Sequence, residues 1–167
     1  MCQYQVLVTC IFLNKTYAVS ARPYLEDFLE EYPTPRSLQD ADPKTIASVY
    51  FKRLGLYRRA WWLVEMAHQL LTDPPQPNVL RRKSGPNAGL WSEVSHLAGV
   101  GEYASDAWRL FCKQKFYARY GISVADEWRT LQPVDKELKK YVKRKKLEER
   151  SRVIEEDLAR RLMATRL

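Results

Sequence analysis

Two glycines one residue apart stand in the stretch 96–112, "HLAGVGEYASDAWRLFC", directly before a helical pattern. Gly99 and Gly101 lack a Cβ, so a ligand can approach their backbone closely, and Val100 between them can pack inward as an anchor. The first N–H groups of the helix that follows have no intrahelical partners and suit a phosphate. Taken alone, the pattern fits a tight helical corner as well as an anion-binding turn.

A carboxylate follows about thirty residues later, in "LQPVDKELKKY". Asp135 stands behind a proline at the expected start of the last helix, where Asp is a preferred N-cap. A carboxylate that accepts backbone N–H bonds keeps its ionised form. Such a fixed anion can stabilise an oxocarbenium-like sugar and orient an attacking water. Capping and catalysis are compatible, so both roles remain open.

The chain around these residues is expected to form helices, because the apolar spacing is helical almost throughout and shows no clear β alternation. We predict an all-α fold. A helix that is apolar nearly all round is expected to be central, and the others are expected to be amphipathic. The expected helices cover residues 4–16 (the central one), 19–33 (ended by Pro33), 57–73, 102–117, and a long basic stretch from 133 or 135 onward.

Local signals mark several boundaries. Asp42-Pro43 is a favourable pair for an N-cap and first helical position, and Gly55 suits a helix C-terminus. In the helix over 57–73, the buried side is expected to consist of Trp61, Val64, Met66, Ala67 and Leu70 or Leu71. The stretch 73–91, "DPPQPNVLRRKSGPNAGLW", reads as a long loop, and a loop of this length in a compact domain is functional or mobile.

The charge favours an anionic partner, either nucleic acid or an acidic membrane surface. The formal net charge is +8, and residues 136–167 hold 12 Lys and Arg against 6 Asp and Glu. This basic helix is either a solvated helix with internal ion pairs or a face that contacts phosphates.

Cysteine and histidine usage argues against bound metals. Cys2, Cys10 and Cys112 form no CxxC pair or disulfide framework, and His68 and His96 are the only histidines. Zinc and iron–sulfur sites therefore lack ligands, and a reducing compartment is expected. The apolar start "QVLVTCIFL" is too short to span a membrane, so no membrane-spanning segment is expected there and the stretch is expected to be a buried helix.

Taken together, five stretches are similar to the helix-hairpin-helix (HhH-GPD) DNA glycosylase superfamily, and most of all to its methyl-CpG-binding thymine glycosylase branch. In chain order they are "IFLNKT", "FLEEYPTP", "LGLYRRA", "GVGEYASDAWRLFC" and "QPVDKELKKY", and they cover most of residues 7–145. The resemblance implies a two-lobed helical domain, with the helix-hairpin-helix motif and a cleft between the lobes. It implies base-excision repair of thymine or uracil mispaired with guanine in duplex DNA.

The resemblance also assigns site residues. Asp135 would be the catalytic carboxylate and Tyr103 would line the pocket of the flipped base. Lys15 would fill the gap that this base leaves, and Leu56 would be a wedge beside the orphaned guanine, as flipping requires. The phosphate-binding hairpin, which a monovalent cation often assists in this superfamily, would consist of Leu97, Gly99, Val100 and Gly101.

The resemblance further predicts the reaction type. Bifunctional members carry a Schiff-base lysine two residues after the last hairpin glycine, where this sequence has Tyr103. A phenol forms no imine, so a monofunctional hydrolase is expected. Branches with an iron–sulfur cluster carry cysteines after the catalytic region, and none follows Cys112, so no such cluster is expected.

The expected organisation is a glycosylase domain over residues 1–150 and a basic helical extension over 151–167. The segment that family members carry ahead of the first helix is expected to be missing. A nuclear monomer acting on damaged or mismatched duplex DNA is expected. The alternative is a non-catalytic DNA-binding module that keeps the hairpin. A helical protein–protein adaptor would have no reason to contain "QPVDKEL" after "GVGEY".

Overall fold

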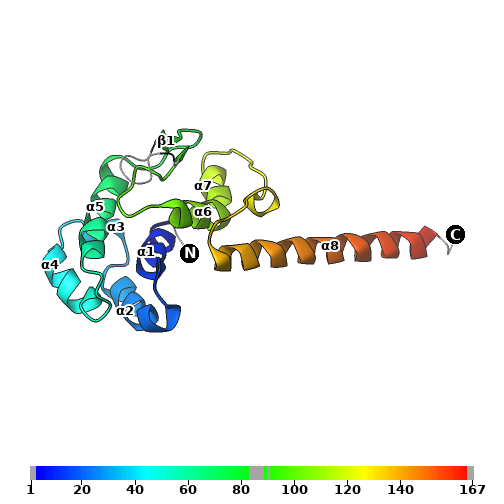
Figure 1. The fold of residues 1–167 in the computed structure, drawn as a ribbon. Helices are drawn as coiled ribbons and strands as arrows, with labels where there is room; N and C mark the ends of the chain where they lie inside the picture. The colour runs from blue at the N-terminus through cyan, green and yellow to red at the C-terminus, as the bar shows by residue number, and fades with distance from the viewer. Residues whose placement is uncertain (1–2, 83–88, 90, 165–167) are drawn as a thin grey trace. The chain divides into compact units, whose positions relative to one another are not determined.

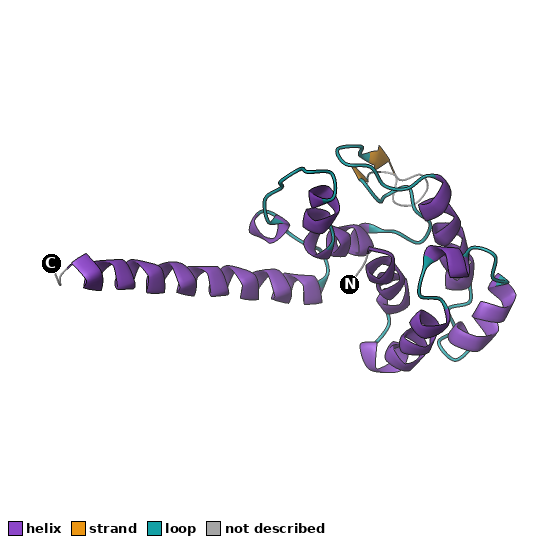
Figure 2. Ribbon diagram, turned by 180° about the vertical axis from the view of Figure 1, so that it is seen from behind, coloured by secondary structure: helices purple, strands orange, loops and turns teal. Residues whose placement is uncertain are grey.

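The computed structural model describes residues 3–82, 89 and 91–164. The described chain is mostly helical, with one short pair of strands (Figures 1 and 2), and the predicted all-α class is confirmed. The chain divides into two compact units, Met1–Ala125 and Asp126–Leu167. No described helix has the length and apolar character needed to cross a membrane.

The first unit consists of helices at its two ends in sequence and a pair of short strands between them. Its elements are α1 (Gln3–Leu13), α2 (Ala18–Glu31), α3 (Pro35–Leu38), α4 (Pro43–Ile46), the π-helix η1 (Ala47–Phe51), α5 (Arg58–Thr72), β1 (Arg81–Arg82), β2 (Trp91–Ser92), α6 (Glu102–Phe111) and α7 (Lys113–Ala118). The second unit contains the short 3₁₀ helix η3 (Glu127–Arg129) and the long helix α8 (Lys136–Ala164). The predicted domain limit at residue 150 falls inside α8 and stays a prediction.

Helix α1 is the centre of the first unit. It contacts α2, α5 and α6, which surround it in Figure 1. Seven of its eleven residues are buried, so its nearly continuous apolar sequence is explained by packing on several sides. Phe12 of α1 stacks on Phe28 of α2 and on Phe51 of η1, at ring-centroid distances of 5.3 and 4.6 Å.

Predicted helix starts are confirmed where a side chain caps the backbone. Asp42 accepts hydrogen bonds from the N–H groups of Lys44 and Thr45, and Pro43 follows as the first helical residue. Gly55 has a φ of +67°, which a glycine adopts easily. The expected helix 102–117 is instead broken at Cys112, which lies between α6 and α7.

The buried side of α5 differs from the one expected. Trp61 was expected to be buried but is 46% exposed, whereas Ala60, Leu63, Met66 and Ala67 are buried. Arg59 lies on the same buried face, four residues before Leu63. The buried face of α5 therefore includes the cation of Arg59. A prediction that considers only apolar residues does not find this position.

Arg59 closes the C-terminal end of α1. Its guanidinium Nη1 donates to the carbonyl oxygens of Ile11 and Phe12, at 2.8 and 2.7 Å, and its Nη2 donates to that of Asn14. The residue is 7% exposed, and burial lowers the pKa of its guanidinium. The last carbonyl groups of a helix have no intrahelical partners, so one buried side chain satisfies several of them at once.

The segment after α5 is a short antiparallel ribbon, although no strand was expected there. Arg81 of β1 is opposite Ser92 of β2, and Arg82 is opposite Trp91. Arg81 also pairs with Asp73 at the end of α5, at 2.7 Å. Residues 83–88 and 90 of the expected loop lie outside the described residues.

A buried polar cluster ties the same segment to α7. Glu93 is 2% exposed; it accepts a hydrogen bond from the Tyr117 hydroxyl at 2.7 Å and pairs with Lys113 at 3.5 Å. The Tyr117 hydroxyl in turn accepts the N–H of Asn78 at 2.9 Å. Burial and the bond to Glu93 raise the pKa of Tyr117, so its hydroxyl stays a donor at neutral pH.

The role of Arg59 predicts a stability change. We expect Arg59→Met to lower the free energy of unfolding by about 2–4 kcal/mol, because the buried α1 carbonyl groups lose a charged donor. Arg58→Met, on the exposed neighbour, is the control and should change it by less than about 0.5 kcal/mol. Urea unfolding measures both, and equal midpoints for the two variants would contradict the assignment.

Candidate functional site

The hairpin before α6 is a tight turn anchored by its apolar residues. Gly99 has a φ of +73°, and the Val100 N–H donates to the Leu97 carbonyl oxygen at 3.2 Å. Leu97 is fully buried and Val100 is 1% exposed, so both side chains hold the turn from inside. The inward packing predicted for Val100 is confirmed. Leu97 and Val100 can therefore serve a ligand only through their backbone.

The hairpin leaves backbone donors available. Within the described part of the chain, the N–H groups of Gly99, Gly101 and Glu102 donate to no other residue. Gly101 is the N-cap of α6 and offers no side-chain cap. The adjacent Ala98 N–H is held by the Gln69 side chain at 2.7 Å, which fixes the turn to α5. Free amides at a helix start are suited to an anion.

Gly99 also allows the hairpin to approach two helices closely. A Cβ on Gly99 would lie 2.8 Å from Cδ1 of Ile11 in α1 and 3.1 Å from Cβ of Trp62 in α5. Ile11 is itself buried, and the Trp62 Cβ is fixed to the backbone, so neither can move aside freely. Both the left-handed backbone and the packing therefore require glycine at this position.

The expected monovalent cation can be tested against the hairpin carbonyl groups. Those of Leu97 and Gly101 accept N–H bonds from Val100 and Ser105. Among the described residues, those of Ala98, Gly99 and Val100 accept none. Carbonyl oxygens are suitable ligands for a hard cation. The residues fit such an ion, which stays a prediction; when bound, it would add positive charge beside a phosphate.

Helix α6 carries the residue predicted to line a base pocket. Tyr103 lies in its first turn, two residues after Gly101, and is half-buried. Tyr103 is therefore within four residues of the hairpin amides that have no partner among the described residues. Its role toward a flipped base stays a prediction.

Two residues predicted to enter the duplex lie in connections between helices. Lys15 is exposed and has a φ of +54°, in the turn that follows α1. Arg59 holds this turn through the Asn14 carbonyl and the Thr16 hydroxyl, the latter at 3.1 Å. Leu56 is half-buried just before α5, and its N–H donates to the Phe51 carbonyl oxygen at 3.3 Å.

Asp135 caps α8 with one of its two carboxylate oxygens. Oδ1 accepts the N–H groups of Glu137 and Leu138 at 2.8 and 3.0 Å. Oδ2 accepts no hydrogen bond from any residue that the structure describes. The nearby Glu137 carboxylate pairs with Lys140 at 3.0 Å. The predicted capping role is confirmed, and the free Oδ2 leaves the catalytic role open.

The predicted site residues are divided between the units. Lys15, Leu56, Tyr103 and the hairpin lie in the first unit, and Asp135 lies in the second. Within the first unit, Ile11 joins two parts of the site, because its carbonyl binds Arg59 and its side chain abuts Gly99. Arg59 and Gln69 were not predicted. Arg59 had a signal, because it falls on the helical repeat of the buried α5 face.

The packing at Gly99 predicts the effect of adding one methyl group. Gly121→Ala, at a φ of +71° with open space, should cost only the backbone strain of about 1–2 kcal/mol. Gly99→Ala should cost that amount and about 1–3 kcal/mol more, because the methyl group overlaps Ile11 and Trp62. Thermal or urea unfolding of both variants measures the difference. Equal losses would show that the hairpin is not pressed against α1 and α5.

The chain is similar to known proteins over part of its length. No family model matches the sequence. A solved structure described as a thermostable thymine-DNA glycosylase is 24% identical, with a TM-score of 0.48, over 64% of this chain and 45% of the other. A methyl-CpG-binding domain protein 4-like protein of Arabidopsis thaliana is 28% identical over 109 residues. That match covers 65% of this chain but only 21% of the relative. The likeness to this relative supports the predicted resemblance to the methyl-CpG-binding branch.

Proposed function

We propose that the chain is a DNA glycosylase that removes thymine or uracil mispaired with guanine. The observation that carries the proposal is the state of Asp135, which is fixed by two backbone N–H groups through Oδ1 and keeps Oδ2 open. The free amides of the hairpin and the similarity to the methyl-CpG-binding domain protein 4-like protein support it.

The binding step uses the first unit. The N–H groups of Gly99, Gly101 and Glu102 would hold a backbone phosphate and set the register of the duplex. Exposed Lys15 and half-buried Leu56 would occupy the space left in the stack, which offsets part of the energy of flipping the base. Tyr103 would contact the flipped base.

The chemical step uses Asp135. As the bond between C1′ and the base nitrogen breaks, positive charge develops on the sugar, and the anionic Oδ2 stabilises it. A water oxygen then bonds to C1′; one of its protons is lost and the departing base takes up a proton. The products are a free base and an abasic site. Tyr103 offers no amine for an imine, so the strand stays intact.

The proposal extends to the setting of the reaction. The substrate would be duplex DNA with a mismatched or damaged base, the protein would act in the nucleus as a monomer, and no iron–sulfur cluster would take part. These points follow from the resemblance of the motifs.

Replacement of Asp135 tests the chemistry. We expect Asp135→Asn to slow release of thymine or uracil from a duplex with a G·T or G·U pair by about 100-fold or more. Asn caps a helix about as well as Asp, so α8 should keep its start and DNA binding should persist. Strand cleavage should appear only after hot alkali. Product release is followed in single-turnover reactions.

Glu137→Gln is the matched control, because it removes a neighbouring carboxylate that pairs with Lys140. It should retain nearly the full rate. Base release that survives Asp135→Asn would refute the catalytic assignment. Tight binding by the native protein without any base release would instead support the non-catalytic DNA-binding module.

A further inference from the structure

Most basic residues of helix α8 fall into two groups, and only Lys136 and Arg160 belong to neither. One group forms ion pairs along the helix: Lys140 with Glu137, Arg144 and Lys145 with Glu148, Arg152 with Glu149 and Glu156, and Arg161 with Asp157. These pairs neutralise much of the charge of the bases that take part in them.

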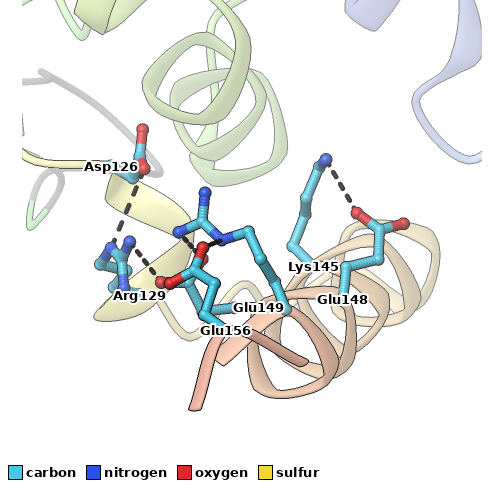
Figure 3. Close-up of polar contacts among 7 residues, drawn as sticks. Asp126, Arg129, Lys145, Glu148, Glu149 and Glu156 are labelled. Carbon is cyan, nitrogen blue, oxygen red and sulfur yellow. Dashed lines mark hydrogen bonds and ion pairs between the residues drawn. The ribbon is translucent and has the colours of Figure 1, made fainter. Parts of the chain in front are cut away.

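Figure 3 shows this network around Glu149. Arg129 of η3 donates to Glu149 at 2.8 Å and also approaches Asp126 at 3.8 Å. Nearby, Lys145 and Glu148 form their own pair at 2.9 Å. The hydrogen bond from Arg129 lowers the pKa of Glu149, so this carboxylate stays charged within the network. Acidic groups of α8 are thus engaged with the paired bases.

The other group is a stripe without carboxylate partners. Lys139, Lys143, Lys146 and Arg150 are exposed, and no residue in the described ranges forms an ion pair with them. At 3.6 residues per turn, these four positions fall within an arc of about 60° and extend over about 16 Å of the helix. They therefore present four positive charges in a row. We call them the α8 stripe.

The stripe borders a shallow hollow in the second unit. The hollow has a volume of about 410 Å³, and besides the four bases it is lined by Leu131, Gln132, Pro133, Val142 and Leu147. Its floor is largely apolar. The aliphatic stems of the bases can lie over this floor while their charged ends stay in water.

We propose that the α8 stripe binds the phosphate backbone of duplex DNA beside the reacting nucleotide, an inference that rests on the proposed function. A DNA strand carries one negative charge per about 3.4 Å of helix axis, so the stripe spans about five nucleotides. Lys139 follows Asp135 by about one helical turn, and Arg150 by about four. With Asp135 at the sugar, the stripe extends along the flanking duplex.

The regular spacing favours a polyanion over an acidic peptide. The four charges are separated by three or four residues, which corresponds to about 4.5–6 Å along the helix. Asp157, which continues the same line of the helix, is paired with Arg161 at 2.8 Å. Between Lys139 and Arg150 no acidic residue falls in the arc of the stripe, because Glu148 and Glu149 lie on other sides of the helix.

Two variants with equal charge loss test the inference in the full chain. The stripe variant combines Lys139→Gln, Lys143→Gln, Lys146→Gln and Arg150→Gln. The control variant combines Lys140→Gln, Arg144→Gln, Lys145→Gln and Arg152→Gln, all from the ion-paired group. Binding to an undamaged duplex is measured between about 50 and 200 mM salt, the range over which phosphate contacts dominate the change in affinity. Circular dichroism checks that α8 is retained.

We expect the slope of log affinity against log salt to become less steep by about 3.6 in the stripe variant and by less than about 1 in the control, since each of four phosphate contacts contributes about 0.9. Equal changes in the two variants, or none in either, would overturn the inference. Stronger competition by polyglutamate than by duplex for the stripe would also overturn it, in favour of an acidic peptide partner.

A parallel assay of base release separates the two proposals. If the native protein releases thymine or uracil but both variants share one salt slope, the stripe is wrong and the proposed function stands. If the native protein releases no base, but the slope of log affinity against log salt becomes less steep in the stripe variant alone, the proposed function is wrong and the stripe still binds duplex DNA.

Discussion

The arrangement of the first unit depends on how the end of α1 is closed. A helix that is apolar on nearly every side can be buried centrally, but its last carbonyl groups then need donors inside the protein. Arg59 of α5 supplies them from a buried position. The same contacts hold the turn that presents Lys15, so the path of the chain after α1 depends on a residue more than forty positions away.

The hairpin depends on the same pair of helices. Gly99 rests against Ile11 and Trp62, and Gln69 of α5 holds the N–H of Ala98. The hairpin amides can stay without partners because the turn is fixed by these other contacts. The proposed anion site therefore consists of backbone groups whose positions are set by packing. Asp135 follows a similar rule, because its capping bonds fix the carboxylate while leaving one oxygen open.

Features determined by neighbouring residues could be predicted from the sequence. The cap at Asp42, the inward packing of Val100 and the cap at Asp135 all follow from local preferences. Features that depend on distant contacts could not. The rotated face of α5 requires knowing that Arg59 meets α1. The ribbon of two-residue strands is too short to show an alternating pattern.

The charge of α8 illustrates the same limit in another way. Its net charge and helical character were evident, but both a solvated helix and a phosphate-binding face remained open. Helical spacing alone pairs some bases with acids three or four residues away. The hollow beside the stripe requires the contact of residues 131–133 with α8, which only the folded chain shows. The structure shows the ion pairs of a solvated helix, and the contact with phosphates is proposed for the α8 stripe.

The proposed role of Asp135 is to stabilise positive charge on the sugar of a flipped nucleotide. Its most direct test is the affinity for a duplex in which a cationic pyrrolidine replaces that sugar opposite guanine, compared with an uncharged tetrahydrofuran analogue. A transition-state mimic should bind about 100-fold tighter or more. If Asp135 has this role, the native protein shows the preference for the cationic duplex and the Asp135→Asn variant loses it. Equal affinities of the native protein for the two duplexes would contradict it.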